Sequence, residues 1–431
     1  MERFPHGCDH LLLAELSRQV FARCELAVAL TESPGQITRT FCSTAIAQLH
    51  RQFVEWMEAL GITCRVDAAG NLWGKLHSFA TDAPSLIVGS HLDTVPNGGR
   101  YDGLLGVMLG LALAEASVRS GTMLPFSLEI VGFSEEEGVR FSVPFIGSLA
   151  VIGECDDELL SRTDRQAISV GSALQLFGCV PTAIQSAAIS PAHVLAFIEP
   201  HIEQGPVLQS EGLPLGIVTA IAGQTRAVAH FRGEAGHAGT VPMNLRRDAL
   251  TAAAEWILAV EDLARRTPGL VATVGFIEVL PGAGNVIPGE ARAKLDVRHA
   301  DDVIRGAAVA AIVDAGNAIA IRRGVGFQLS IVHQHDAAAM SAPIVAALEQ
   351  SLSEVGIAPR RLVSGAGHDA AVMARRFSTG MLFVRCRDGI SHHPDESVTV
   401  EDITAALTVL WSFTQHLALQ PLATMRNNKE T

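Results

Sequence analysis

Hydrophobic and polar residues follow three different patterns along this chain, and each pattern predicts a different part of the fold. The first pattern covers roughly the first 80 residues. Residues 11–29 and 44–60 carry apolar side chains at helical spacing, and residues 62–66 and 71–75 are short β-type runs on either side of a turn signal. We therefore predict two helices and a hairpin in this part of the chain.

The second pattern consists of short, continuous apolar runs. Such runs occur at residues 86–88, 128–131, 194–198 and 381–384. Their length and apolarity are typical of parallel strands that are buried on both faces. A helical pattern at residues 104–116 follows the first run. Strand and helix in alternation predict an open α/β sheet.

The third pattern, at residues 215–332, indicates a separate module. Strand-like runs and two Ala-rich helical stretches follow one another in the order β-β-α-β-β-α, at residues 216–220, 225–231, 248–263, 270–278, 291–297 and 303–322. This order predicts a small α+β sandwich. Because the α/β pattern returns afterwards, we predict a discontinuous first domain, residues 1–214 and 333–431, with the module inserted.

Composition agrees with a globular protein of more than one domain. The chain has 431 residues, of which 48% are hydrophobic and 18% charged. Its net charge of −13 disfavours a general nucleic-acid binder, which needs a basic face. A local arginine could still bind a small anion. The longest apolar runs are too short to span a bilayer, so no membrane partner is expected.

The cysteines and the N-terminal residues favour a cytoplasmic location. The seven cysteines are scattered without paired spacing, and we expect them to be reduced. The chain begins with Met1-Glu-Arg-Phe-Pro-His and shows no basic segment followed by an apolar one. We therefore expect no signal peptide.

Metal-binding residue types follow each of the four apolar runs. His91 follows the first run, Glu135–Glu137 the second, His201 the third and His392 the fourth. The carboxyl ends of parallel strands meet at one edge of a sheet, where sites form in open α/β folds. A chance scatter of histidines and glutamates would not follow the strand ends, so we predict a metal site there.

Each of these residues also has a structural alternative. Asp93 could orient His91 through the second ring nitrogen, or the pair could be a polar turn. Asp102 could bridge two cations, or it could cap the following helix. The three glutamates could be a solvated loop, or one could bind metal while its neighbour moves a proton. His201 or His392 alone would be structural more often than functional.

Together the motifs resemble one known family. GSHLDTVPNGGRYDG, SEEEG, HIEQG, GEAGHAGTVPM, NVIPG, SGAGHD and GISHHP occur in order between about residue 40 and about residue 415. As a set they are similar to the amidase/hydantoinase–carbamoylase branch of the aminoacylase and zinc-carboxypeptidase superfamily. That branch includes allantoate amidohydrolases, N-carbamoyl-L-amino acid hydrolases and β-ureidopropionases.

The resemblance implies a two-metal exopeptidase-like catalytic domain of the α/β class. Asp102 would bridge two divalent ions, either zinc, manganese or cobalt. Further ligands would be His91 and His201 for one ion, and Glu137 and His392 for the other. Asp93 would orient His91, and Glu136 would be the general base.

The resemblance also implies that the inserted module is a ferredoxin-like lid and dimerisation domain. His237 would act in the partner subunit's site of a homodimer, where it would stabilise the oxyanion. Asn285 and Arg298 would hold the substrate carboxylate, although Arg298 could instead form a surface salt bridge. The backbone of Gly367 would lie near the substrate. The role of His368 is left open, and His393 is given none.

The expected substrate is a small ureido carboxylate, with hydrolysis of its carbamoyl C–N bond. Gln224 stands where similar bacterial allantoate enzymes carry Gln, so we favour allantoate, with release of ammonia and carbon dioxide. Gln224 could instead satisfy backbone groups of the lid. The alternatives are an N-carbamoyl-L-amino acid hydrolase or a β-ureidopropionase. A metallopeptidase is disfavoured by His201 and Gly138, and a non-catalytic relative by the complete set of ligands and base.

Overall fold

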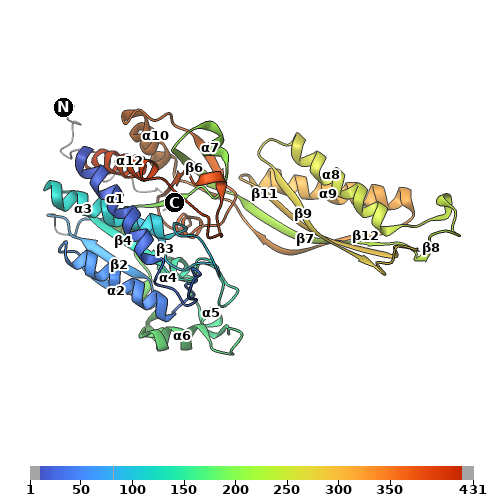
Figure 1. The fold of residues 1–431 in the computed structure, drawn as a ribbon, viewed down its shortest axis with the longest axis horizontal. Helices are drawn as coiled ribbons and strands as arrows, with labels where there is room; N and C mark the ends of the chain where they lie inside the picture. The colour runs from blue at the N-terminus through green and yellow to red at the C-terminus, as the bar shows by residue number, and fades with distance from the viewer. Residues whose placement is uncertain (1–9, 81, 420–431) are drawn as a thin grey trace. The chain divides into compact units, whose positions relative to one another are not determined.

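A computed structural model describes residues 10–80 and 82–419, and these residues form two compact units (Figure 1). The chain passes from unit 1 to unit 2 between Thr219 and Ala220, and returns between Ala339 and Met340. Cys8 and the first six residues, on which the signal-peptide prediction rests, lie outside the described residues.

Unit 1 is built around a large mixed sheet, although two of the paired segments of this sheet, residues 220–221 and 338–339, belong to unit 2. Within the described residues this sheet has nine strands in the order β1-β2-β4-β3-β5-β15-β6-β13, with β14 paired to β6. The strands are β1 (Thr63–Val66), β2 (Leu72–Leu76), β3 (Ser85–His91), β4 (Ser127–Phe133), β5 (Val194–Ile202), β6 (Leu215–Ile221), β13 (Ala338–Ala339), β14 (Arg361–Ser364) and β15 (Thr379–Val384). The main α-helices are α1 (His10–Ala27), α2 (Thr44–Glu58), α3 (Leu104–Ser120), α10 (Ala342–Glu354) and α12 (Val400–Leu419). Shorter helices are α4 (Ile146–Ile152), α5 (Asp157–Ser161), α6 (Val170–Phe177), η1 (Pro181–Ala187), η2 (Pro191–His193), α7 (Val207–Glu211), α11 (Asp369–Met373) and η4 (Arg387–Gly389).

The predicted buried strands form the centre of this sheet. β3 pairs in parallel with β4 and β5, and β15 pairs in parallel with β5. Every residue of β3, β5 and β15 is buried. Each buried Val, Leu or Ile side chain contributes about 1.5–3 kcal/mol, so continuous apolar runs stabilise the sheet on both faces. The prediction of four parallel strands is confirmed.

Helix α3 packs directly on the central strands. It contacts β3, β4 and β5, and its first 14 residues, 104–117, are all buried. Gly106 allows this close approach, because a Cβ there would lie 2.1 Å from the carbonyl oxygen of Pro200. The helix is therefore apolar on all sides, as expected for a helix covered by protein.

Unit 2 contains a four-stranded antiparallel sheet and two long helices within the described residues. The sheet order is β12-β7-β11-β9, and a two-stranded ribbon pairs β8 with β10. Its elements are β7 (Gly223–Arg232), β8 (Gly236–His237), η3 (Met243–Leu245), α8 (Ala249–Arg266), β9 (Val271–Leu280), β10 (Val286–Ile287), β11 (Glu290–His299), α9 (Asp302–Arg323) and β12 (Gly326–His335). The main elements follow the β-α-β-β-α-β order of a ferredoxin-like fold.

Two details of the predicted module are wrong. The run at residues 216–220 lies in β6, whose residues Leu215–Val218 pair with β15, so it belongs to the large sheet. The last strand of the module, β12, was not predicted. It lies at the edge of its sheet and most of its side chains are exposed, so it lacks the continuous apolar run of a buried strand.

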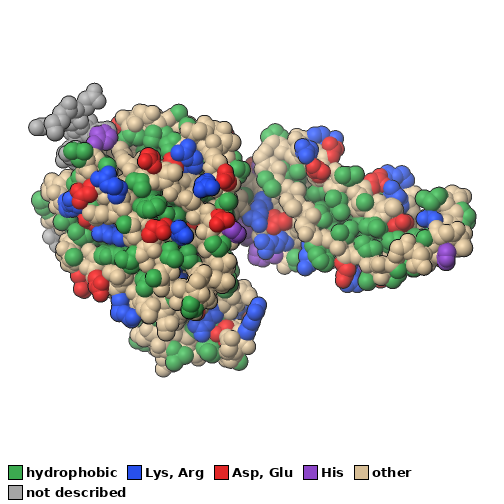
Figure 2. Space-filling view, in the orientation of Figure 1, with side chains coloured by type: hydrophobic (Ala, Val, Ile, Leu, Met, Phe, Trp, Pro, Cys, Tyr) green, Lys and Arg blue, Asp and Glu red, His purple; other side chains and the backbone are tan. Residues whose placement is uncertain are grey.

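Charged side chains of both signs are interspersed on the face of the molecule that Figure 2 shows. The net charge of −13 is thus not gathered into one acidic patch on that face. Among the described helices, one, α9, is long and apolar enough to cross a membrane by length and composition alone. Its Ala308, Ile312 and Ile319 instead belong to the hydrophobic core of unit 2.

Candidate metal centre

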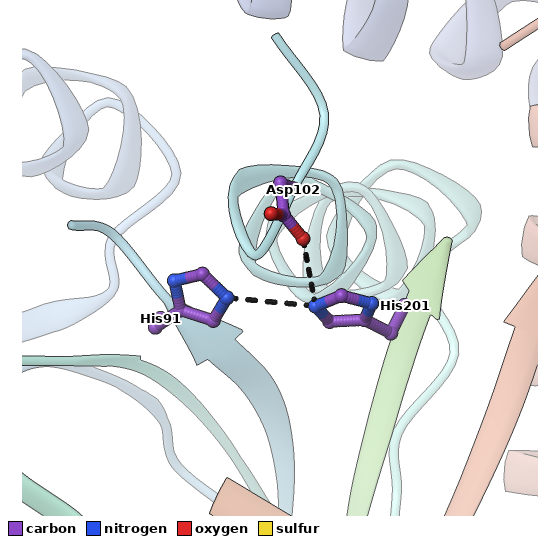
Figure 3. Close-up of side chains that lie close together, drawn as sticks. All are labelled: His91, Asp102 and His201. Atoms are coloured by element: carbon purple, nitrogen blue, oxygen red, sulfur yellow. Dashed lines mark hydrogen bonds and ion pairs between the residues drawn. The ribbon is translucent and has the colours of Figure 1, made fainter. Parts of the chain in front are cut away.

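Three predicted ligands meet at the carboxyl ends of neighbouring strands (Figure 3). His91 ends β3, His201 lies near the end of β5, and Asp102 lies just before α3. The Nε2 atoms of His91 and His201 are 3.5 Å apart, and Asp102 Oδ1 is 3.3 Å from His201 Nε2. All three side chains are at most 3% exposed. Their ligand atoms lie within 4.8 Å of one another, as three ligands of one cation require.

The other oxygen of Asp102 faces a second group. Asp102 Oδ2 is 3.2 Å from His392 Nε2, and Glu137 Oε1 is 3.5 Å from the same nitrogen. Ligand atoms of Asp102, Glu137 and His392 also lie within 4.8 Å of one another. The two groups share Asp102, and each group takes a different carboxylate oxygen. This arrangement suits a carboxylate that bridges two cations.

Glu136 lies beside both groups. Its Oε2 is 4.0 Å from His91 Nε2, and the side chain is 8% exposed. Burial raises the pKa of Glu137 to about 7, and burial together with the neighbouring Glu137 raises that of Glu136 well above its usual range. Placing these carboxylates side by side out of water is therefore costly unless cations offset the charge.

The donor atoms of the centre fit divalent metal ions. Among the described residues, the buried Glu137 Oε1 accepts no hydrogen bond. The histidine nitrogens and carboxylate oxygens that converge here are the donor types that zinc, manganese and cobalt bind in proteins. A cation would bind this oxygen, which has no hydrogen-bond donor among the described residues, so the residues fit the metals implied by the sequence.

Asp93 approaches His91 more closely through its main chain than through its carboxylate. His91 Nδ1 is 3.0 Å from the backbone oxygen of Asp93, but 3.7 Å from its carboxylate Oδ1. The carboxylate instead accepts hydrogen bonds from the backbone N–H groups of Glu136 and Glu137. Asp93 therefore links the segment after β3 to the glutamate turn after β4, and its main chain orients His91.

The alternative role of Asp102 as a helix cap does not apply. The N-cap position of α3 is Gly103, and no side chain within residues 10–80 and 82–419 forms a capping hydrogen bond to this helix. Gly103 has a φ of 65°, and a Cβ at this position would lie 2.5 Å from the His91 ring. Glycine is thus required here both by the backbone conformation and by the imidazole beside it.

Comparison with known proteins identifies the family. A model described as peptidase family M20/M25/M40 matches residues 87–416. The chain belongs to this family. Members of the M20/M25/M40 family use two divalent metal ions, and the chain is a hydrolase with groups positioned to bind them.

Several relatives are similar over nearly the whole chain. A probable allantoate deiminase from Oryza sativa subsp. japonica is 35% identical, over 97% of this chain and 92% of its own. An N-carbamoyl-L-amino acid amidohydrolase from Geobacillus stearothermophilus is 38% identical, over 91% of this chain and 96% of its own. A solved amidase of the hydantoinase/carbamoylase family from Burkholderia multivorans has a TM-score of 0.89 and 33% identity, over 94% of this chain and 98% of its own. The resemblance to this branch is thereby confirmed.

Three residues that position Asp102 in this M20/M25/M40 enzyme were not predicted from the sequence. Gln204 Nε2 donates to Asp102 Oδ1 at 3.1 Å and to Ser391 Oγ at 3.0 Å. Glu396 Oε1 accepts hydrogen bonds from the backbone N–H groups of Tyr101 and Asp102. Gln204 lies within the HIEQG motif and Ser391 within GISHHP, so their places in these motifs were the available signal. Glu396 carried no such signal.

Further buried polar side chains surround His201 and the strands beside it. His368, whose role was left open, packs edge-on against the His201 ring with centroids 4.5 Å apart and lies 2.9 Å from Ser364 Oγ. Glu199 accepts hydrogen bonds from the hydroxyl of Ser90 and the N–H of Ala370. These contacts tie the loop that contains Gly367 to the strands that carry the histidines. His393 is exposed and forms a local ion pair with Asp395.

In unit 2, two predicted substrate-binding residues share one carboxylate. Gln224 and Arg298 are cross-strand neighbours on β7 and β11. Asp296 Oδ2 accepts from Gln224 Nε2 at 2.7 Å, and the Arg298 guanidinium binds the same carboxylate through Nε and Nη2. Arg226 donates to it as well. Asp296 was not predicted, because no motif contains it and its role depends on strand pairing.

The other two predicted lid residues lie at the opposite end of unit 2. His237 is exposed on β8, where it pairs with Val286, and Asn285 accepts a hydrogen bond from the N–H of Ala238. Strand β7 separates this ribbon from Gln224. The part of β7 from Gln224 to its last residue, Arg232, spans about 26 Å of extended chain. Within one chain, the two pairs are too far apart to contact the same small molecule.

Proposed function

We propose that this enzyme hydrolyses allantoate, cleaving the carbamoyl C–N bond with release of ammonia and carbon dioxide. The polar network around Asp296 carries this proposal. It fixes Gln224, Arg226 and Arg298 on neighbouring strands of unit 2. Allantoate has a carboxylate and two ureido groups, and a subsite of amide and guanidinium donors suits such a molecule better than an apolar side chain. Relatives from rice and soybean are named allantoate deiminases.

The proposed roles in unit 1 follow from the geometry of the metal centre. His91, Asp102 and His201 would hold one ion, and Asp102, Glu137 and His392 the other. These ions would supply a Lewis acid and an activated water. Glu136 would take a proton from the attacking water at Oε2 and deliver it to the leaving nitrogen. Gln204 and Glu396 would keep the two oxygens of Asp102 directed at the two ligand groups.

The proposed site is shared between two subunits of a homodimer. Arg298 would grip the substrate carboxylate through its planar guanidinium group. His237, with Asn285 beside it, would come from the partner chain and stabilise the developing oxyanion. The length of β7 supports this division, since one chain cannot bring both pairs to one small substrate. We further propose a cytoplasmic location.

A carbamoylase is the second candidate. Its support is the Geobacillus stearothermophilus relative, which is 38% identical to this chain. An N-carbamoyl-L-amino acid has one ureido group and a side chain, so an apolar second subsite would suit it better. Gln224 is 4% exposed and donates to Asp296. It therefore contributes to the polar network and not to an apolar surface.

Substrate preference is tested by steady-state kinetics on the metal-loaded enzyme. Ammonia release would be measured for allantoate, N-carbamoyl-L-methionine and β-ureidopropionate with added manganese or zinc. We expect kcat/KM for allantoate to exceed that for the carbamoyl amino acid by at least about tenfold, or roughly 1.4 kcal/mol. The reverse order would refute the allantoate proposal while leaving the hydrolase assignment intact.

A further inference from the structure

A buried cation lies next to the segment that follows His91. Arg39, in the loop between α1 and α2, is 1% exposed. Moving a charge out of water is costly, and an apolar side chain of similar volume often stabilises a core equally well. Of the described residues, none accepts a hydrogen bond from the buried Nη2 of Arg39. The stability of the fold alone is therefore not a sufficient reason for an arginine at this position.

The guanidinium group of Arg39 joins two segments of main chain. Its Nε donates to the carbonyl oxygen of Leu92 at 3.1 Å, and its Nη1 donates to that of Ala27 at 3.4 Å. Leu92 lies between His91 and Asp93, directly after β3. Ala27 is the last residue of α1, where helix carbonyl groups carry partial negative charge and favour a cation. Arg39 thus holds the segment after β3 against the end of α1.

The backbone around Arg39 strengthens this connection. The Arg39 N–H donates to Thr94 Oγ1 at 3.0 Å, and the Thr94 N–H donates to the Arg39 carbonyl oxygen at 2.9 Å. Further along the chain, the Gly98 N–H donates to the carbonyl oxygen of Ile37 at 2.8 Å. Residues 37–39 therefore lie along the first part of the loop that joins β3 to α3.

The segment that Arg39 holds determines where two parts of the metal centre lie. The backbone oxygen of Asp93 is 3.0 Å from His91 Nδ1, and the Asp93 carboxylate accepts hydrogen bonds from the backbone N–H groups of Glu136 and Glu137. Burial lowers the pKa of Arg39 to about 10, so the guanidinium group is charged at pH 7 and attracts the Asp93 carboxylate. A displaced segment would move both a metal ligand and the turn that carries the proposed base.

We propose that Arg39 is a positioning residue of the metal centre. Its planar guanidinium group fixes the main chain at Leu92, and this segment in turn fixes the His91 ring and, through Asp93, the glutamate turn. The inference rests on the proposed roles of the metal ligands, but not on the identity of the substrate. Loss of the guanidinium group should therefore disturb metal binding and turnover, and not only the stability of the fold.

Metal binding is tested by titrating the metal-free, full-length protein with cobalt(II) and recording visible absorption. The titration reports the Kd, and the absorption bands report the geometry of the ligands. Arg39→Met should raise the Kd at least tenfold and shift the bands. Arg305→Met is the matched control, because it removes a guanidinium group that is equally buried, at 2% exposed, but lies in unit 2. It should change neither quantity, and a wild-type Kd and spectrum in Arg39→Met would overturn the proposal.

Arg39→Lys separates the shape of the guanidinium group from its charge. A lysine ammonium keeps the charge but lacks the planar fork that reaches both carbonyl oxygens. We expect its Kd for cobalt to lie at least threefold above the wild-type value and below that of Arg39→Met, while thermal unfolding confirms the fold. If Arg39→Met does not fold, a wild-type Kd in Arg39→Lys would refute the proposal. If neither variant folds, Arg39 serves the fold and the proposal fails.

Steady-state kinetics provide a readout that a purely structural role would not move. At saturating cobalt, kcat for ammonia release should fall at least tenfold in Arg39→Met, whereas KM should change less than twofold because the proposed substrate-binding groups lie in unit 2. The substrate is allantoate or N-carbamoyl-L-methionine, whichever the wild-type protein hydrolyses faster. A rise in KM without a loss of kcat would contradict the positioning role.

Failure of this proposal is distinguishable from failure of the proposed function. A wild-type protein that does not bind cobalt would refute the metal centre itself. A wild-type protein that prefers the carbamoyl amino acid would refute only the allantoate proposal. Neither result depends on a change at Arg39, whereas the positioning role is judged from the ratio of variant to wild-type values.

Discussion

The metal centre of unit 1 and the polar pairs of unit 2 are built in different ways. In unit 1, the residues at the strand ends are mostly buried, and Asp102 has hydrogen-bonding partners on several sides. In unit 2, His237 and Asn285 are exposed, and Arg298 binds a carboxylate, that of Asp296, which is 28% exposed. The difference indicates that the groups of unit 1 are fixed in advance by burial and hydrogen bonds, whereas those of unit 2 are more open to solvent.

The largest effect should come from the proposed base in unit 1. Glu136→Gln keeps the shape of the side chain but removes its ability to take a proton, so kcat should fall by about 10³-fold or more. Metal content, measured by mass spectrometry, should stay at the wild-type level. Glu129→Gln is the matched control. This residue lies on β4, the strand that precedes the glutamate turn, and the variant should retain activity. Activity retained in Glu136→Gln would overturn the proposed mechanism.

The next effect tests the role of unit 2 across subunits. His237→Ala should lower kcat by about 10²–10³-fold, because an oxyanion donor is lost. Arg298→Ala should lower kcat/KM to a similar extent by raising KM, because a group that would bind the substrate carboxylate is lost. When the two inactive variants are unfolded and refolded together, half of the dimers are mixed and each has one complete site. About a quarter of the wild-type activity should return. No recovery, with mixed dimers present, would refute a shared site.

A third prediction concerns the glycine beside the metal ligands. Gly103→Ala forces a Cβ to within 2.5 Å of the His91 ring at a φ of 65°. Displacement of a ligand by about 1 Å should lower activity by about 10²-fold and weaken metal binding. Gly121→Ala has the same type of backbone strain, with a φ of 68°, but a Cβ there meets nothing within 4 Å. If both variants lose metal equally, the contact with His91 is not the cause.

The smallest effect should come from the network in unit 2. Asp296→Asn removes the charge that orients Gln224 and Arg298, so KM for the substrate should rise about tenfold while kcat changes little. Asp262→Asn removes an exposed carboxylate of α8 and serves as the control. A loss confined to kcat would place Asp296 outside substrate binding and weaken the contrast between the two units.

Much of the fold was predictable because its signals are local. The apolar runs of β3, β4, β5 and β15 identify buried strands, and their burial requires little more than hydrophobicity. Strand β12 escaped prediction because its exposed edge position removes that signal. The run that forms β6 was assigned to the wrong unit, since sequence does not reveal that a strand pairs with one far along the chain.

The sequence by itself determined which side chains stand at the strand ends, because parallel strands in one sheet bring their carboxyl ends to one edge. Only the tertiary structure decided how those side chains are used. In the folded chain one oxygen of Asp102 faces His201 and the other faces His392. The Asp93 carboxylate accepts hydrogen bonds from the backbone N–H groups of Glu136 and Glu137. Folding also places Gln204 and Glu396 against Asp102, and Asp296 against Gln224. Their partners lie on other segments of the chain, and such contacts depend on packing between segments and not on local sequence.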